Sequence, residues 1–270
     1  MYDLIVIGSG PGGYEAAAHA ADLGGSVLLV EKGEIGGICL NAGCIPTKTL
    51  LRSARAYADC REASTYGVQV DGDPGIDFQQ MQNRKQQVVE NLRKGVSQML
   101  KKKGVEVLQA HGSIKGEGRV EADGKEFECR HILVATGSKP AVPPIKGIDA
   151  PHVLDSSGIL EISELPESLV VIGAGYIGLE YAFLMAELGV KVQVLEMLPQ
   201  IIPAVDSEIT KQLQRALKKA GVSLKTSCRV EEIKDNAVVY TDKNGNSQEV
   251  ETAMVLNATG RQPIVESAGF

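Results

Sequence analysis

Short apolar runs alternate with glycine-rich turns and helical stretches along the first part of the chain. Residues 4–7 form an apolar run typical of a strand buried on both faces of a parallel sheet. The glycine-rich stretch 8–13 follows, and an alanine-rich segment over 15–23 predicts a helix that ends at a glycine pair. Residues 27–30 predict a second buried strand. Together these segments predict a β-α-β unit.

The same pattern returns later in the chain. An apolar run at 170–172 leads into a second glycine turn, a helix expected over 179–188 and a strand at 192–195. The glycines of the two turns correspond at a constant spacing of 165 residues, Gly8 with Gly173, Gly10 with Gly175 and Gly13 with Gly178. The repeat therefore predicts two domains of one kind.

The segment between the two units predicts two further helices. One runs from just after Pro46 to about Ala63, and the other covers 78–103. Prolines concentrated between residues 139 and 152 indicate a crossing between domains. We predict an α/β fold with two Rossmann-like nucleotide-binding domains. The expected ranges are 1–148 for the first domain, 149–264 for the second, and 265–270 for the start of a return to the first.

Composition and charge narrow the function classes. The 270 residues are 43% hydrophobic and 23% charged, as in ordinary globular proteins, and the net charge of −6 disfavours nucleic acid or an anionic membrane as a partner. No run approaches the roughly 18 apolar residues that a membrane span needs. The N-terminus lacks the features of a signal or transit peptide, so we expect a cytoplasmic protein.

Each glycine turn has the context of a dinucleotide-binding fingerprint, with a buried strand before it, a helix after it and an acidic residue after the next strand. Free N–H groups at the start of the helix favour a pyrophosphate, and Glu31 and Glu196 are the expected acceptors for ribose hydroxyls. The alternative is a β-α turn that binds no dinucleotide. Residues 197–203 contain no basic side chain for a 2′-phosphate, so the second site is expected to prefer NAD over NADP.

The stretch GGICLNAGCIPTK at 36–48 places Cys39 and Cys44 just before a predicted helix. A helix N-terminus stabilises a thiolate, and a disulfide that closes so small a ring would be accessible and reducible. A zinc site is disfavoured because neither a second cysteine pair nor a histidine lies nearby, whereas two unrelated buried cysteines remain an alternative. The isolated Cys60, Cys129 and Cys228 are interpreted as structural.

The whole chain resembles the N-terminal part of the flavin-dependent pyridine nucleotide–disulfide oxidoreductases. The resemblance rests on GSGPGG at 8–13, GGICLNAGCIPTK at 36–48, ATGSKP at 135–140, GAGYIGLE at 173–180 and NATGRQP at 257–263. The form CLNAGCIPTK is similar to the dihydrolipoyl dehydrogenase branch of the family. The lack of a basic residue after Glu196 agrees, because the glutathione and mercury branches normally use NADPH.

The resemblance implies FAD on the first fingerprint and NAD on the second, with no metal. The implied FAD contacts are Gly8, Gly10, Gly13, Glu31, Lys32, Gly37, Lys48, Gly112, Thr136, Gly137 and Ser138. The implied contacts around NAD are Gly173, Gly175, Tyr176, Ile177, Gly178, Glu180, Glu196, Val230 and Gly260. Tyr176 is expected to cover the nicotinamide pocket until the nucleotide enters.

The resemblance also implies a reaction and partners. Cys39 and Cys44 would form the redox disulfide, with Cys39 exchanging with substrate and Cys44 contacting the flavin. Lys48, paired with Glu180, would stand near the reactive nitrogen of the flavin. Protein-bound dihydrolipoamide would be oxidised to lipoamide with reduction of NAD⁺. The implied partners are lipoyl domains of 2-oxo acid dehydrogenase or glycine-cleavage complexes, and a second subunit in a homodimer of the full-length protein.

The sequence stops at Phe270, before the Gly-Asp motif and the interface domain with a His-Glu pair that the resemblance implies. We therefore expect an incomplete FAD domain, and little or no lipoamide turnover by this chain alone because the general base is missing. Two alternatives stay open. One is another family member, such as a mercuric reductase or an NADH-dependent disulfide reductase, and the other is an NAD-binding redox module without turnover.

Overall fold

The computed structural model describes residues 1–266 and 269, so residues 267, 268 and 270 of the expected returning segment lie outside the described residues. The chain divides into two compact units. The first comprises Met1–Pro46, Lys85–Lys139 and the described residues from Arg261 on, and the second comprises Thr47–Arg84 and Pro140–Gly260. These units are discontinuous, unlike the ranges 1–148 and 149–264 that the sequence suggested.

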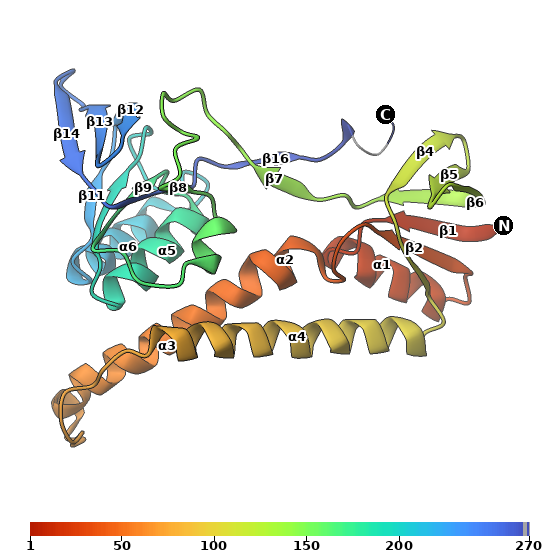
Figure 1. Cartoon of the computed structure of the whole chain (residues 1–270), viewed down its shortest axis with the longest axis horizontal. Helices are drawn as coiled ribbons and strands as arrows, with labels where there is room; N and C mark the ends of the chain where they lie inside the picture. The colour runs from red at the N-terminus through yellow and green to blue at the C-terminus, as the bar shows by residue number, and fades with distance from the viewer. Residues whose placement is uncertain (267–268, 270) are drawn as a thin grey trace. The chain divides into compact units, whose positions relative to one another are not determined.

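The first unit is built around a six-stranded sheet in the order β3-β2-β1-β6-β5-β4. Figure 1 shows β4, β5 and β6 together on one side of β1. The strands are β1 (Tyr2–Ile7), β2 (Val27–Glu31), β3 (Glu106–Gln109), β4 (Gly112–Gly116), β5 (Arg119–Ala122) and β6 (Lys125–Val134). Strands β1, β2, β3 and β6 are parallel, and β4, β5 and the start of β6 form an antiparallel meander. Helices α1 (Pro11–Asp22) and α2 (Gly37–Ala42) lie wholly in this unit.

Strand β1 is buried on both faces, which explains its continuous apolar sequence. Ile5 and Ile7 pack with Val120 of β5 on the meander side. Val6 packs on the other side with Ala17 of α1 and Leu100 of α4 (Phe78–Lys102). The α4 helix spans residues of both units, as does α3 (Cys44–Glu62). The alternation of faces along β1 therefore sets which elements can cover the sheet.

The second unit contains a parallel sheet in the order β11-β10-β9-β15-β8. Its strands are β8 (Val153–Leu154), β9 (Ser168–Ile172), β10 (Lys191–Leu195), β11 (Ser223–Lys225) and β15 (Met254–Asn257), and its helices are α5 (Tyr176–Glu187) and α6 (Ser207–Lys219). A separate antiparallel sheet consists of β12 (Arg229–Lys234), β13 (Ala237–Thr241) and β14 (Ser247–Glu251). The short elements are η1 (Ala63–Tyr66), η2 (Gly158–Glu161), β7 (Ser138–Pro140) and β16 (Arg261–Pro263).

The strand orders confirm the repeat that the sequence predicted. In each sheet the strand before the glycine turn lies between the strand after the following helix and a later strand, as β1 lies between β2 and β6 and β9 lies between β10 and β15. The burial pattern repeats as well, because Leu169 and Val171 face one apolar cluster and Val170 and Ile172 face another. The α/β class with Rossmann-like units is therefore confirmed.

The start of the redox segment differs from the prediction. The α3 helix begins at Cys44, two residues before Pro46, because proline is tolerated in the first helical turn. The preceding α2 helix was not predicted, since its six residues are too short to show a helical period. Cys39 therefore lies inside a short helix, and Cys44 is the first residue of the next one.

Candidate functional site

The first glycine turn brings three backbone segments into close contact. A Cβ atom on Gly8, whose φ is +101°, would lie 2.3 Å from the carbonyl oxygen of Ala135. A Cβ atom on Gly13 would lie 1.9 Å from the carbonyl oxygen of Gly8. Gly10 differs, because no heavy atom lies within 4 Å of its added Cβ. Gly8 and Gly13 therefore close the turn, and Gly10 faces open space.

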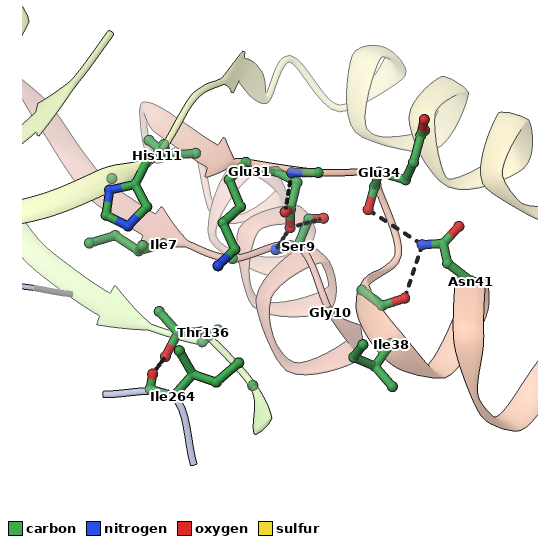
Figure 2. A pocket seen from close by; sticks show the side chains of 18 of the residues that line it. Ile7, Ser9, Gly10, Glu31, Glu34, Ile38, Asn41, His111, Thr136 and Ile264 are labelled. Atoms are coloured by element: carbon green, nitrogen blue, oxygen red, sulfur yellow. Dashed lines mark hydrogen bonds between the residues drawn. The ribbon is translucent and has the colours of Figure 1, made fainter. Parts of the chain in front are cut away.

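That space belongs to a cavity of about 470 Å³ in the first unit (Figure 2). Of the residues expected at FAD, those that line it are Gly8, Gly10, Glu31, Lys32, Gly37, Gly112, Thr136, Gly137 and Ser138. Cys39 also lines the cavity, whereas Gly13 and Lys48 do not. The structure thus brings most of the expected FAD contacts and one cysteine of the pair to a single cavity.

The Glu31 side chain is held by the turn that it faces (Figure 2). Its Oε2 accepts hydrogen bonds from the backbone N of Ser9, at 2.7 Å, and from the Ser9 hydroxyl, at 2.6 Å. Its Oε1 accepts a hydrogen bond from the backbone N of Gly33 at 2.8 Å. The carboxylate is therefore oriented at the cavity wall before any ligand binds.

Asn41 and Arg93 also hold the cavity wall that carries Glu31. The sequence did not predict this contact. The Asn41 amide donates to the carbonyl oxygens of Ile35, at 3.0 Å, and Gly37, at 2.9 Å, and Figure 2 shows it directed at the Glu34 backbone as well. Arg93 of α4 donates from Nε to Asn41 Oδ1 at 3.0 Å, and its Nη1 lies 3.2 Å from Glu34 Oε2. Asn41 lies in the GGICLNAGCIPTK motif, which was a signal in the sequence, but its partner Arg93 lies 52 residues further along the chain.

Residues from the end of the chain hold the opposite wall. The Thr136 hydroxyl donates to the carbonyl oxygen of Ile264, which also lines the cavity. Arg261 donates from Nε to the Ser138 hydroxyl at 2.8 Å and from Nη2 to the Ser138 carbonyl oxygen at 2.5 Å. The loop that carries three expected FAD contacts, Thr136, Gly137 and Ser138, is therefore fastened by a segment that follows the second unit in sequence.

The cysteines have different surroundings. Cys39 is half-buried at the cavity, and Cys44 is exposed at the start of α3. Burial raises the pKa of the Cys129 and Cys228 thiols, and both are buried, as their structural interpretation predicted. Cys60, interpreted in the same way, is exposed. Among the described residues, no group of three or more His, Cys, Asp or Glu side chains could hold a metal ion.

The second glycine turn repeats the geometry of the first. A Cβ atom on Gly178 would lie 2.1 Å from the carbonyl oxygen of Gly173, whereas one on Gly175 would meet no atom within 4 Å. Glu196 Oε2 accepts a hydrogen bond from the backbone N of Ala174 at 2.6 Å, and its Oε1 accepts one from Leu198 at 2.7 Å. The same local sequence thus builds the same cradle twice.

The remaining expected contacts of the second site lie on several different elements. Tyr176 is 61% exposed at the first residue of α5, and Ile177 beside it is half-buried. Val230 is buried in β12, on the antiparallel sheet, and Gly260 follows the end of β15 with open space at its Cβ position. The structure places Tyr176 so that its ring is free of the core.

The expected pair of Lys48 and Glu180 is present. Lys48 Nζ of α3 lies 2.7 Å from Glu180 Oε2 of α5. The neighbouring residues make a buried contact, because the Tyr181 hydroxyl lies 3.2 Å from the Thr47 hydroxyl and donates to the Ser156 carbonyl oxygen at 2.8 Å. Burial raises the pKa of Tyr181 well above its usual value, so this hydroxyl stays protonated. The buried hydrogen bond between the Thr47 and Tyr181 hydroxyls therefore fixes the contact of α3 with α5 beside the Lys48–Glu180 pair.

Comparison with known proteins agrees with the α/β fold of two Rossmann-like units. The family model described as "Pyridine nucleotide-disulphide oxidoreductase" matches residues 2–269. The chain belongs to this family of oxidoreductases, whose cofactors are FAD and NAD(H). No helix in the described part of the chain is both long and apolar enough to cross a membrane.

Curated relatives extend the comparison. The chain is 38% identical to a dihydrolipoyl dehydrogenase of Acholeplasma laidlawii, over 96% of this chain and 78% of the relative. It is 40% identical to a dihydrolipoyl dehydrogenase of Bacillus subtilis, over 96% of this chain but only 58% of the relative. A solved structure of the HOCl-induced flavoprotein disulfide reductase RclA from Escherichia coli matches with a TM-score of 0.82 and 32% identity, over 98% of this chain and 58% of that chain. The chain thus spans little more than half the length of several relatives.

Proposed function

We propose that this chain provides the dinucleotide and dithiol machinery of a dihydrolipoyl dehydrogenase, which oxidises protein-bound dihydrolipoamide with reduction of NAD⁺. The observation that carries the proposal is the position of Cys39, which lines the same cavity as Gly10 and Glu31. A redox-active cysteine pair can pass its electrons on only where the pair lies near a cofactor, and Cys39 brings the pair to this cavity.

The cavity in the first unit fits FAD. Gly10 leaves open the space that a side chain would fill, so a pyrophosphate can approach the backbone at the start of α1. Glu31 is oriented for a ribose hydroxyl, and Lys32, Gly37, Gly112 and the 136–138 loop line the rest of the cavity. When bound, FAD would supply the step that thiols lack, which is conversion of an electron pair from the dithiol into a hydride for NAD⁺.

The cysteine pair would perform thiol–disulfide exchange. A substrate thiolate attacks Sγ of Cys39 in the Cys39–Cys44 disulfide, which forms a mixed disulfide and releases Cys44 as a thiolate. The second substrate thiol, after losing its proton, displaces Cys39 and closes the substrate disulfide. The substrate loses two electrons and the cysteine pair gains them.

The second fingerprint is the proposed NAD site. Gly175 would leave the space for the pyrophosphate, while Gly173 and Gly178 close the turn behind it. Glu196 would accept a ribose hydroxyl and exclude a 2′-phosphate. We also propose that Tyr176 covers the nicotinamide pocket and that Lys48, paired with Glu180, lies beside the flavin. Further proposed contacts of NAD are Ile177, Val230 and Gly260.

The proposed partners follow from the substrate. Lipoyl domains of 2-oxo acid dehydrogenase or glycine-cleavage complexes would present the dithiol, and a homodimer is proposed for the full-length protein. The names of the curated relatives support this assignment. The cytoplasm is the proposed location.

The test is reduction of the FAD-loaded chain by dihydrolipoamide without oxygen, followed by visible flavin absorbance. We expect slow loss of the oxidised flavin band in the wild-type chain, because one reduction needs a single exchange and not sustained turnover, and no loss in Cys39→Ser or Cys44→Ser. Cys60→Ser, which changes an exposed cysteine away from the cavity lining, is the matched control and retains the reaction. Persistence of the reaction in both cysteine variants of the pair would overturn the proposal.

A second candidate is a reductase that consumes NADH to reduce a disulfide substrate. It is favoured by the likeness to the Escherichia coli flavoprotein disulfide reductase. The same cysteine pair serves this reaction in the opposite direction. Comparing dihydrolipoamide with NADH as the reductant in the anaerobic experiment separates the two, because a dedicated reductase would respond to NADH and hardly to dihydrolipoamide.

A further inference from the structure

Each fingerprint holds one carboxylate, Glu31 in the first and Glu196 in the second, and the two differ in the number of polar groups that donate to it. The backbone N of the residue after the first glycine donates to the carboxylate in both units, from Ser9 to Glu31 and from Ala174 to Glu196. A second backbone N, two residues beyond the carboxylate, donates to its other oxygen in both units. Among the described residues, only the first unit adds a side-chain donor, the Ser9 hydroxyl at 2.6 Å from Glu31 Oε2.

The Ser9 hydroxyl has little freedom to do anything else. Ser9 is fully buried, and its Oγ accepts a hydrogen bond from the backbone N of Gly36 at 3.2 Å while its proton points to Glu31. An ionised carboxylate can only accept, so the direction of the Ser9–Glu31 bond is fixed. Ser9 therefore links the carboxylate to the turn at Gly36 that precedes α2, the helix of Cys39.

The extra donor changes how many acceptor positions remain for a ligand. A carboxylate oxygen has about two acceptor positions. Oε2 of Glu31 is filled by the two Ser9 donors, so one position remains, on Oε1. Glu196 receives one donor on each oxygen, so one position remains on each. The two carboxylates therefore offer different numbers of acceptors to a ribose.

We propose that Ser9 is a positioning and specificity residue, which restricts Glu31 to one ribose hydroxyl of the first dinucleotide, whereas Glu196, opposite Ala174, accepts two hydroxyls of the second. The inference rests on the proposed placement of FAD and NAD. It gives the two sites different requirements for the same adenosine ribose, although their glycine turns are alike. The fixed carboxylate of the first site suits a resident cofactor, because less ordering is needed on binding.

The experiment measures dissociation constants of FAD and NAD⁺ and of their analogues that lack either the 2′- or the 3′-hydroxyl of the adenosine ribose. A lost hydrogen bond to a charged acceptor is expected to weaken binding about tenfold. At the first site we expect only one of the two deoxy analogues to bind about tenfold more weakly than FAD. At the second site we expect both deoxy analogues to bind more weakly than NAD⁺.

Reciprocal variants exchange these patterns. Ser9→Ala should make FAD binding sensitive to both hydroxyls and leave the NAD⁺ pattern unchanged. Ala174→Ser should make NAD⁺ binding sensitive to only one hydroxyl and leave the FAD pattern unchanged. Each variant serves as the control for the other site, and far-UV circular dichroism confirms that both are folded.

The outcomes separate the inference from the function on which it rests. Wild-type binding of both cofactors with unchanged hydroxyl patterns in both variants would overturn the role of Ser9 and leave the cofactor sites standing. A wild-type chain that binds NAD⁺ but not FAD would refute the proposed first site, and Ala174→Ser would then decide the inference at the second. A chain that binds neither FAD nor NAD⁺ would refute both the proposed cofactor sites and the role of Ser9.

Discussion

The same added methyl group should mainly lower stability at one glycine of the first turn and mainly weaken FAD binding at another. In Gly13→Ala the new Cβ would lie 1.9 Å from the Gly8 carbonyl oxygen and 3.3 Å from the Ala135 side chain. Overpacking costs about 1–3 kcal/mol, and the value here is at the upper end because the Gly8 backbone has no rotamer with which to move away. Replacement of a helical glycine by alanine returns roughly 1 kcal/mol, so the expected net loss is about 2 kcal/mol.

Gly10→Ala is the matched variant. Its Cβ meets no atom within 4 Å, and Gly10 has φ −63° and ψ 176°, a conformation that alanine adopts without strain. The expected change in stability is below about 1 kcal/mol, which reflects the poorer N-cap. The methyl group enters the proposed pyrophosphate position, so FAD affinity should fall at least about tenfold, equivalent to about 1.4 kcal/mol.

The assay combines urea unfolding, followed by far-UV circular dichroism, with FAD binding followed by flavin fluorescence. The expected result is a lower unfolding midpoint in Gly13→Ala and weak FAD binding with a nearly normal midpoint in Gly10→Ala. Normal FAD affinity in Gly10→Ala would refute the placement of the pyrophosphate. Normal stability in Gly13→Ala would refute the steric argument.

Three further predictions concern charged side chains. Lys48→Met should slow flavin reduction more than tenfold and lower stability by less than about 1 kcal/mol, since the Lys48–Glu180 pair is partly exposed; equal losses in rate and stability would contradict the proposed role. Arg93→Ala should weaken FAD binding several-fold, because Arg93 holds Asn41 and Glu34 at the cavity wall, whereas Lys94→Ala, exposed on the same helix, should leave FAD binding unchanged. Burial raises the pKa of Glu187 above its usual value of 4.5, so the native state binds the carboxyl proton more tightly than the unfolded state does. The free energy of unfolding therefore falls as the pH rises from 4.5 through the raised pKa. Glu187→Gln should therefore raise the melting temperature at pH 7 and leave it unchanged at pH 4; an equal rise at both would exclude the ionisation as the cause.

The amino-acid sequence by itself determined the repeated architecture. Each apolar run of a few residues followed by a glycine turn and a helix is a local signal, and Gly8 and Gly173 open the same turn in both units. Local signals need no knowledge of which strands pair, so the class of fold and the two cradles could be predicted. The Lys48–Glu180 pair came from the family resemblance, because nothing in the spacing of residues 132 positions apart indicates a contact.

The tertiary structure alone decided how the walls of the first cavity are held. The hydroxyl of Ser9 reaches Glu31 across 22 residues, Arg93 reaches Asn41 across 52, and Thr136 reaches Ile264 across 128. Each of these bonds depends on the order of strands in a sheet or on which helix covers it, and a one-dimensional pattern contains neither. For the same reason the short α2 helix around Cys39 and the difference between Ser9 and Ala174 acquire meaning only once the carboxylates are in place.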